Sequence, residues 1–252
     1  MTTATAFIAG LGLWAPGYAN AAAWAQARPD AAVTDPPAAI LPARLGRRSS
    51  TLTRIAAEVL LQAGANAALG EIATVYATAY GETQTMGAIL ESISTEGSCS
   101  PARFHNSVHN TAAGLLSIAT VNRSFSTTLS AGTETVAMAL LESLAILQQR
   151  GGEVIAVFAD EAPPAPFGRE GFAPAGAALR LSACPLPGAA QVWLRRASSE
   201  VSFEMRPAFA SNPIAPALAL VEGLHRGRGG VFALSTGNGC WTLDAAPRRQ
   251  DG

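Results

Sequence analysis

Apolar residues recur along this chain with two alternating periods. Spacings of three and four residues, which place apolar side chains on one face of a helix, predict helices over residues 53–68, 81–94, 111–122, 136–147 and 213–226. Short runs of β-branched and aliphatic residues predict strands over residues 6–13, 72–79, 125–129, 153–159, 175–182, 231–235 and 240–244. Strands that alternate with helices are typical of an α/β fold in which helices cover a sheet.

The segments between these elements have loop composition. Loops are expected over residues 29–42, from the end of helix 81–94 through Arg103, and over residues 163–171. Residues 191–196 and 201–205 are expected to pair as a hairpin. No stretch has the composition of a linker, so one domain over residues 1–252 is predicted.

Composition narrows the class of protein. Charged residues make up 14% of the chain and hydrophobic residues 49%, against roughly 25% charged in an average soluble domain. Disorder is therefore excluded, and a partner is expected to cover part of the surface, because monomers seldom leave large apolar patches open. A net charge of −1 means that the chain lacks the excess of positive charge that is typical of nucleic-acid-binding proteins. The basic cluster at residues 44–48 is expected to be solvated or to dock an acidic partner.

Several kinds of chemistry are excluded by what the chain lacks. All 17 basic residues are arginine, so a P-loop lysine and Schiff-base chemistry are excluded. The three cysteines are odd in number and have no metal-ligand spacing, so neither a disulfide framework nor a metal site is expected. A chain without disulfides fits a reducing cytoplasm. No apolar run reaches the roughly 18 residues of a membrane span.

The search for catalytic residues returns little. His105 and His109 lie four residues apart, a spacing that metal sites on helices use, but no third ligand is near them in sequence. We expect a polar loop or an interface there, with no metal and no cofactor. Neither a Gly-x-Ser-x-Gly elbow nor a dinucleotide-binding glycine motif is present. The residues taken alone support no enzyme class.

The segment Ser-Thr-Thr-Leu-Ser-Ala-Gly at residues 126–132 lies at a predicted strand-to-helix junction. It resembles the nucleophile segment of the β-ketoacyl-acyl carrier protein synthases, Ser-Thr-Ala-Cys-Ala-Ser-Gly. The resemblance places Leu129 where that family has its acyl-accepting cysteine. A helix N-terminus lowers the pKa of a thiol, so leucine would keep the junction and remove the nucleophile.

Other segments resemble the same family in the same order. They lie at residues 7–12, 77–83, 110–114, 169–179 and 235–241. The resemblance puts Pro207 near the position of one catalytic histidine, and the segment that carries the other has no counterpart. It implies a thiolase-like layered αβαβα fold, with an N-terminal half at residues 5–182 and a contracted C-terminal half at 190–245.

A condensing-enzyme fold without its nucleophile resembles the chain length factors. These subunits pair with an active ketosynthase and shape its acyl tunnel, and short examples occur with aryl polyene and related pigment pathways of Gram-negative bacteria. The resemblance implies a catalytic ketosynthase as partner in a heterodimer or heterotetramer, an acyl carrier protein reached through that complex, and a cytoplasmic location. It also implies that residues 104–117 and 121–129 lie at the subunit interface. Tunnel or interface candidates are Met86, Leu90, Phe104, His105, Val108, His109, Thr127, Thr128 and Leu129.

Two other hypotheses remain open from the sequence. One is an acyl transferase or decarboxylase that uses Ser130, Glu134 or a histidine near Leu129. The other is an acyl- or carrier-protein-binding module that acts without a ketosynthase, which an apolar pocket with a basic rim at residues 44–48 would favour.

Overall fold

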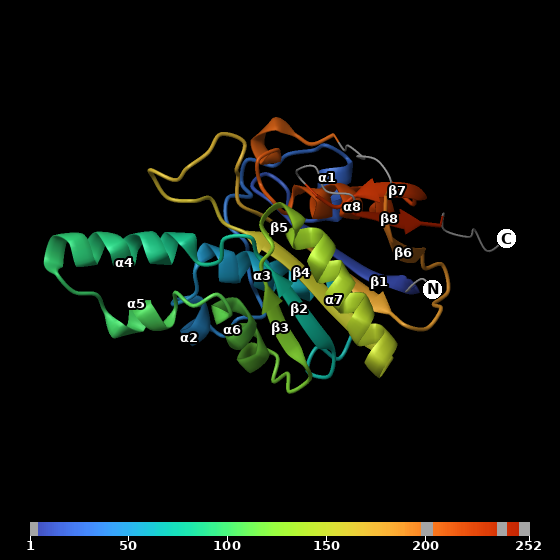
Figure 1. Cartoon of the computed structure of the whole chain (residues 1–252), viewed down its shortest axis with the longest axis horizontal. Helices are drawn as coiled ribbons and strands as arrows, with labels where there is room; N and C mark the ends of the chain where they lie inside the picture. The colour runs from blue at the N-terminus through green and yellow to red at the C-terminus, as the bar shows by residue number, and fades with distance from the viewer. Residues whose placement is uncertain (1–4, 198–203, 236–240, 247–252) are drawn as a thin grey trace.

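The computed structural model describes residues 5–197, 204–235 and 241–246. Its strands form one eight-stranded sheet in the order β3-β2-β4-β5-β1-β6-β8-β7 (Figure 1). The strands are β1 (Thr5–Trp14), β2 (Ala73–Ala77), β3 (Ser126–Leu129), β4 (Glu153–Asp160), β5 (Ala175–Ser182), β6 (Gln191–Arg196), β7 (Gly230–Ala233) and β8 (Trp241–Ala245). The helices are α1 (Ala21–Ala25), α2 (Ala43–Gly46), α3 (Thr51–Ala63), α4 (Thr83–Glu96), α5 (Pro101–His105), α6 (Thr111–Ala119), α7 (Thr135–Arg150) and α8 (Ala215–His225). Short 3-10 turns η1 (Gly132–Glu134) and η2 (Pro207–Phe209) precede α7 and α8.

The parallel part of the sheet fixes the place of the site. β3 and β4 both pair in parallel with β2, and their register sets Leu129 and Phe158 beside Ala77. The carboxyl ends of the three strands therefore meet at one edge of the sheet, where ligands of open α/β sheets bind. β3 is the outermost strand on that side.

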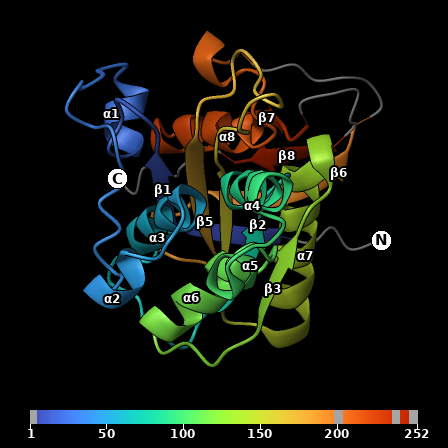
Figure 2. The same cartoon turned by 90° about the vertical axis from the view of Figure 1, so that its left-hand side faces the viewer.

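Helices cover both faces of this sheet (Figure 2). α3 and α6 pack on one face around Ile55, Leu60 and Leu116. α7 and α8 pack on the other face, around Leu140 and Leu218. The mixed α/β fold class predicted from the sequence is thus confirmed, and α8 contacts β1 and β5 of the first half as well as β7 of the second.

Glycines allow α3 to approach the sheet very closely. A Cβ atom added at Gly12 would lie 2.3 Å from the Val59 carbonyl oxygen, and one at Gly10 would lie 2.1 Å from the Ala63 carbonyl oxygen. The glycine-rich β1 is therefore a packing surface for α3.

The second half of the chain is tied to the first through aromatic residues. The guanidinium group of Arg206 stacks 3.9 Å from the centroid of the Trp24 ring on α1. The Trp24 indole N–H in turn donates to a Glu222 carboxylate oxygen on α8, at 2.8 Å. Phe209, next to Pro207 in η2, is buried with its ring edge-on to Trp24.

The structure corrects the predicted ends of three elements. α3 ends at Ala63 rather than at residue 68, because Gly64 lies so close to Leu69 that the chain must turn back there. Residues 101–103, expected as the end of a loop, belong to α5, which Pro101 opens at its first turn. α6 ends at Ala119 rather than at residue 122, since the Asn122 side chain leaves the helix and donates to the Leu69 and Ile72 carbonyls, at 2.7 and 2.8 Å.

The hairpin expected between residues 191–196 and 201–205 is not formed by its described residues. β6 pairs with β1 on one side and with β8 on the other, so neither of its edges is left for residues 204 and 205, which are in no strand. Residues 201–203 of that expectation lie outside the described residues, as does the 236–240 part of the closing turn. Within the described residues no helix combines the length and the hydropathy that crossing a membrane requires.

Candidate functional site

The junction between β3 and α7 has the strand-to-helix geometry that the sequence predicts. Leu129 ends β3 half-buried and packs against the central core. The following turn is held by the Ser130 hydroxyl, which donates to the Ala79 carbonyl at 2.7 Å. The Thr135 hydroxyl donates to the Gly132 carbonyl at 2.8 Å and closes the turn into α7. An aliphatic side chain thus occupies the end of the strand just before the helix.

His109 lies across the edge of the sheet from this junction. Its ring packs on Gly81, where an added Cβ would be 3.1 Å from the His109 Cδ2 atom, and its Nε2 atom is 3.4 Å from the Thr78 carbonyl oxygen. Gly81 has a φ of +68°, a conformation that favours glycine. His109 and Thr128 both line a small space between α6 and the sheet. Part of the predicted set therefore gathers at the carboxyl ends of β2 and β3.

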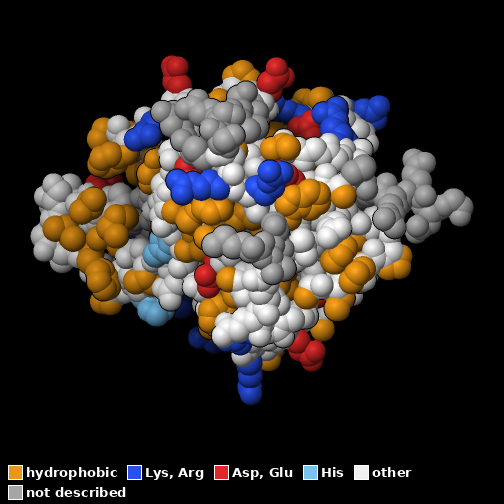
Figure 3. All heavy atoms as spheres, turned by 45° about the vertical axis from the view of Figure 1, so that its right-hand side comes forward, with side chains coloured by type: hydrophobic (Ala, Val, Ile, Leu, Met, Phe, Trp, Pro, Cys, Tyr) orange, Lys and Arg blue, Asp and Glu red, His pale blue; other side chains and the backbone are white. Residues whose placement is uncertain are grey.

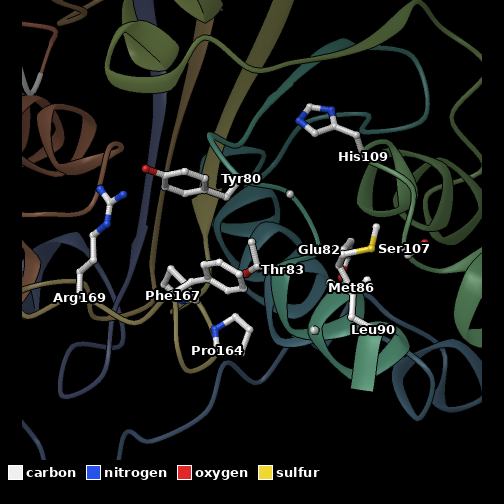
Figure 4. Close-up of a pocket in the computed structure, with 13 residues that line it drawn as sticks. Tyr80, Glu82, Thr83, Met86, Leu90, Ser107, His109, Pro164, Phe167 and Arg169 are labelled. Atoms are coloured by element: carbon white, nitrogen blue, oxygen red, sulfur yellow. The ribbon is translucent and has the colours of Figure 1, made fainter. Parts of the chain in front are cut away.

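An apolar cavity of about 420 Å³ opens between the start of α4 and the loop at residues 163–169. Figure 4 shows Tyr80 and Phe167 on one side of it and Met86 and Leu90 on the other. The lining residues are Tyr80, Gly81, Glu82, Thr83, Met86, Gly87, Leu90, Ser107, His109, Pro163, Pro164, Phe167 and Arg169. Its size is that of a small-molecule site, and we refer to it as the apolar cavity.

Three buried carboxyl groups lie behind this cavity, and Glu82 also lines it. Asp160 accepts hydrogen bonds from the Thr78 hydroxyl at 2.6 Å and from the backbone N–H groups of Ala79 and Tyr80. Burial raises the pKa of Asp160 to about 6 and the pKa of Glu82 to about 7. Their hydrogen bonds act in the opposite direction, because they stabilise the charged form and lower the pKa. Burial also raises the pKa of Glu161.

The two glutamates connect helices that are distant in sequence. Glu82 accepts from the hydroxyl of Ser50, the N-cap residue of α3, at 3.0 Å. Glu161 accepts from the backbone N–H of Leu52 in α3 at 3.3 Å and from that of Gln84 in α4 at 2.8 Å. These carboxyl groups therefore hold the first turns of α3 and α4 against the end of β4.

Beyond its first turns, α4 projects from the sheet together with α5 (Figures 1 and 2). We call α4 and α5 with their connection, residues 83–105, the helical arm. Ile89 is the only buried residue of α4, and α5 has none. Leu90 is 54% exposed, Ile93 48% and Phe104 62%. Figure 3 shows hydrophobic side chains gathered on this lobe of the molecule.

The structure brings only some of the predicted site residues together. Met86, Leu90 and His109 line the apolar cavity, and Thr128 lies under His109. Thr127 and Leu129 are half-buried on the outermost strand. Phe104, His105 and Val108 are exposed on the arm and in the turn that follows it, and none of them lines a cavity described above. No group of three or more His, Cys, Asp or Glu side chains in the described part of the chain could hold a metal ion.

The residues of the opposite wall of the cavity, and the acids behind it, are not among the site residues predicted from the sequence. Tyr80, Phe167 and Arg169 lie in segments expected as turns or loops, where hydrophobic periodicity gives no signal. The pair Asp160 and Glu161 was visible as two acids directly after a long apolar strand. Such a position at the carboxyl end of a buried strand indicates polar side chains turned toward a site.

Comparisons with known proteins agree with this geometry. The sequence pattern of the family "Beta-ketoacyl synthase, N-terminal domain" matches residues 21–233. A search of curated proteins finds no similar sequence.

Solved structures share the fold at low sequence identity. A chain of the ketosynthase ApeO in complex with its chain length factor ApeC, from Xenorhabdus doucetiae, matches with a TM-score of 0.72 and 22% identity, over 97% of this chain and 100% of that one. The ishigamide ketosynthase/chain length factor matches with a TM-score of 0.61 and 16% identity, over 77% of this chain and 68% of that one. A chain of AntDE:AntF, a type II polyketide synthase acyl carrier protein in complex with its ketosynthase, gives a TM-score of 0.56 and 14% identity, over 72% and 63%. These likenesses concern the fold. Because the family pattern spans most of the sequence, this chain belongs to the β-ketoacyl synthase N-terminal domain family.

Proposed function

We propose that this chain is a non-catalytic subunit of the chain length factor type, which pairs with an active β-ketoacyl-acyl carrier protein synthase and shapes its acyl tunnel. The observation that carries the proposal is Leu129 at the end of β3, directly before the turn into α7. In the resembling enzymes this position holds the cysteine that accepts the acyl group. A leucine side chain has no nucleophilic atom, so the subunit would contribute shape rather than chemistry.

The helical arm supports a protein partner. A helix with an apolar stripe is normally covered along that stripe, and Met86, Leu90 and Ile93 recur at helical spacing on α4 with their side chains exposed. β3 is the outermost strand on its side of the sheet, and an outermost strand has backbone groups available for pairing. A ketosynthase seated over β3 and the arm would cover both.

The apolar cavity supports the tunnel-shaping part of the proposal. Met86 and Leu90 lie at its open side, where a partner covering the arm would close it. Each methylene group moved from water into such a space contributes about 0.8 kcal/mol, and a side chain at the end rejects the next extension by steric clash. The carrier protein would then reach the tunnel through the complex, in the cytoplasm.

An acyl transferase that uses Ser130 has less support. The Ser130 hydroxyl donates to a backbone carbonyl, and neither an imidazole nor a carboxylate among the described residues bonds to it. Glu134 accepts from the Ser235 hydroxyl at 2.8 Å instead. A nucleophilic serine needs an adjacent base to accept its proton.

An acyl-binding module that acts without a ketosynthase is favoured by one observation. The apolar cavity has the size of a small-molecule site, although residues 44–48, expected as its basic rim, do not line it. The two functions differ in whether a condensing enzyme is bound to this chain in the cell.

The experiment that tests the proposal is gentle purification of the tagged chain from its own host, with the stoichiometry of bound proteins measured by mass spectrometry and size-exclusion chromatography. We expect an equimolar condensing enzyme with an intact Cys-His-His set. A soluble monomer or homodimer that carries no condensing enzyme would overturn the proposal. If that species binds long-chain acyl groups, the second function replaces the first.

A further inference from the structure

A second cavity, of about 440 Å³, lies on the polar side of the first turns of α4. It is bounded by the segment before α3, by α4, by α5 and by the start of α6. Its lining residues are Arg47, Arg48, Ser49, Ser50, Thr51, Glu82, Gln84, Thr85, Ala88, Arg103, Asn106, Thr111 and Glu161, of which Ala88 alone is apolar. We call it the arginine cavity.

Three arginines line the arginine cavity, and all three are exposed. Arg47 and Arg48 come from the segment between α2 and α3, and Arg103 comes from α5. Within the described residues, the arginines that bond to protein acceptors through their side chains are others, such as Arg54, Arg180 and Arg195. Among the described residues no protein acceptor bonds to the side chains of Arg47, Arg48 or Arg103, so their planar sets of N–H donors face solvent, where a ligand can reach them.

The two carboxyl groups in the cavity already accept hydrogen bonds from the protein. Glu82 accepts from the hydroxyls of Ser50 and Thr53, at 3.0 and 3.2 Å. Glu161 accepts from the backbone N–H groups of Leu52 and Gln84. Both carboxyl groups are buried, and burial raises the pKa of each, which reduces the negative charge that they place beside the arginines. Unused donors and used acceptors make this a cavity for a ligand rich in acceptor oxygens.

From this arrangement we propose that the arginine cavity is a binding site for a phosphate ester, with its phosphoryl group held by Arg47, Arg48 and Arg103. A guanidinium group binds phosphate through two parallel hydrogen bonds, and arginine is preferred wherever such planar recognition matters. The cavity is larger than a bare phosphate ion needs, so the remaining polar groups, among them Ser49, Thr111 and Asn106, would contact the body of the ester. This inference does not depend on pairing with a ketosynthase.

Isothermal titration at constant ionic strength tests the proposal directly. The full chain is titrated in the assembly in which it purifies, with glycerol phosphate, with inorganic phosphate and with glycerol as the uncharged control. We expect saturable binding of one glycerol phosphate per chain, weaker binding of inorganic phosphate, and no binding of glycerol.

Two variants of Arg103 and one matched variant elsewhere locate the site. Arg103→Gln removes the guanidinium group and should weaken glycerol phosphate binding about tenfold, since a hydrogen bond to a charged group is worth 1.5 kcal/mol or more. Arg103→Lys keeps the charge but lacks the planar donor set. Its affinity for glycerol phosphate should lie between that of the unchanged chain and that of Arg103→Gln. Arg123→Gln removes the same charge from an exposed residue outside the cavity and should change nothing.

Two results would overturn the proposal. One is that glycerol phosphate shows no saturable binding to the folded assembly. This result is also expected if acidic side chains of a partner subunit occupy the cavity, and in that case too the cavity is not a phosphate ester site. The other is equal weakening by Arg103→Gln and Arg123→Gln, which would show only a general effect of net charge. Neither result bears on whether a condensing enzyme co-purifies with the chain.

Discussion

At the scale of a single side chain, the proposed function depends on Leu129 and the residues around it. A cysteine placed there would sit at the end of β3, just before the turn into α7. A helix N-terminus lowers the pKa of a nearby thiol, so the position is suited to an acyl acceptor. Condensation also needs the histidines of the family, and by resemblance Pro207 stands near the place of one of them.

We therefore predict that Leu129→Cys leaves the isolated chain without condensation activity. The thiol is expected to react with alkylating agents, which shows that it is accessible, while carbon–carbon bond formation with carrier-bound thioesters stays at the level of the unchanged chain. Mass spectrometry of the product and of the alkylated protein measures both. Condensation by the isolated variant would contradict a non-catalytic role.

Met86 offers a test of tunnel shaping. Met86→Ala removes three heavy atoms from the wall of the apolar cavity, so the product of the complete complex should lengthen by one or two extension units. Leu141→Ala is the matched control, because Leu141 is as exposed as Met86 but lies on α7 and does not line the cavity. Product lengths by liquid chromatography and mass spectrometry decide between them. Unchanged length with Met86→Ala would remove Met86 from the tunnel.

At the scale of elements, the contact between α3 and β1 depends on glycine. Gly12→Ala would place a methyl group 2.3 Å from the Val59 carbonyl oxygen, so α3 must move. We expect a loss of about 2 kcal/mol or more in the free energy of unfolding. Gly114→Ala on α6 makes the same chemical change with nothing within 4 Å of the new atom, and should gain about 0.5–1 kcal/mol from helix propensity. Urea unfolding of both variants measures the contrast, and equal effects would contradict it.

The buried carboxyl groups that hold α3 and α4 should make stability depend on pH. The pKa of Glu82 is raised from 4.5 to about 7, so the folded state holds its proton more tightly than the unfolded state does. Stability from this group is present below pH 4.5 and is lost as the pH rises toward 7, by an amount on the order of a few kcal/mol. Asp160 acts in the same direction between pH 3.8 and 6.

Replacing Glu82 tests whether stability falls with rising pH because of this group. Glu82→Gln keeps an acceptor oxygen for Ser50 and Thr53 but cannot ionise, so it should flatten the fall in the unfolding free energy between pH 4.5 and 7. Glu91→Gln, at an exposed position on the same helix, should leave the pH profile as it is. The measurement is thermal unfolding across that pH range. A profile that is unchanged in Glu82→Gln would show that the pKa of Glu82 is not raised in the folded chain.

The sequence predicts an element well where neighbouring residues determine it, and poorly where contacts with distant residues determine it. β5 begins and ends where its short run of aliphatic residues predicts, since Ala175 to Ser182 are nearly all buried by both layers. The end of α3 depends on Gly64 meeting Leu69, and the partners of β6 are strands more than forty residues away, so local periodicity could not show either. The same limit applies to the site. Met86 and Leu90 were predicted through the resemblance to the condensing enzymes, whereas Phe167 joins them only through the folded loop.

At the scale of the whole molecule, the low content of charged residues and the exposed arm both indicate a surface with large apolar areas. A chain with 14% charged residues has few with which to cover its surface, and its exposed apolar side chains include several on the arm. Surfaces of this kind mark contact with another protein. The isolated chain should therefore associate with itself or precipitate, and a partner that covers the arm should keep it soluble.

The arm variants Leu90→Gln and Ile93→Gln separate this explanation from a general deficit of charge. Each replaces an exposed apolar side chain on α4 with a polar one, so self-association of the isolated chain should fall, and affinity for the co-purifying condensing enzyme should fall on the order of tenfold, as for residues that anchor an interface. Val231→Gln makes a similar change at a 56% exposed residue on β7, outside the arm, and should alter neither quantity. Sedimentation of the isolated chain and titration with the partner measure the two effects. If all three variants improve solubility equally and none weakens the complex, the arm is not the surface that the partner covers, and the subunit must meet its ketosynthase through another face.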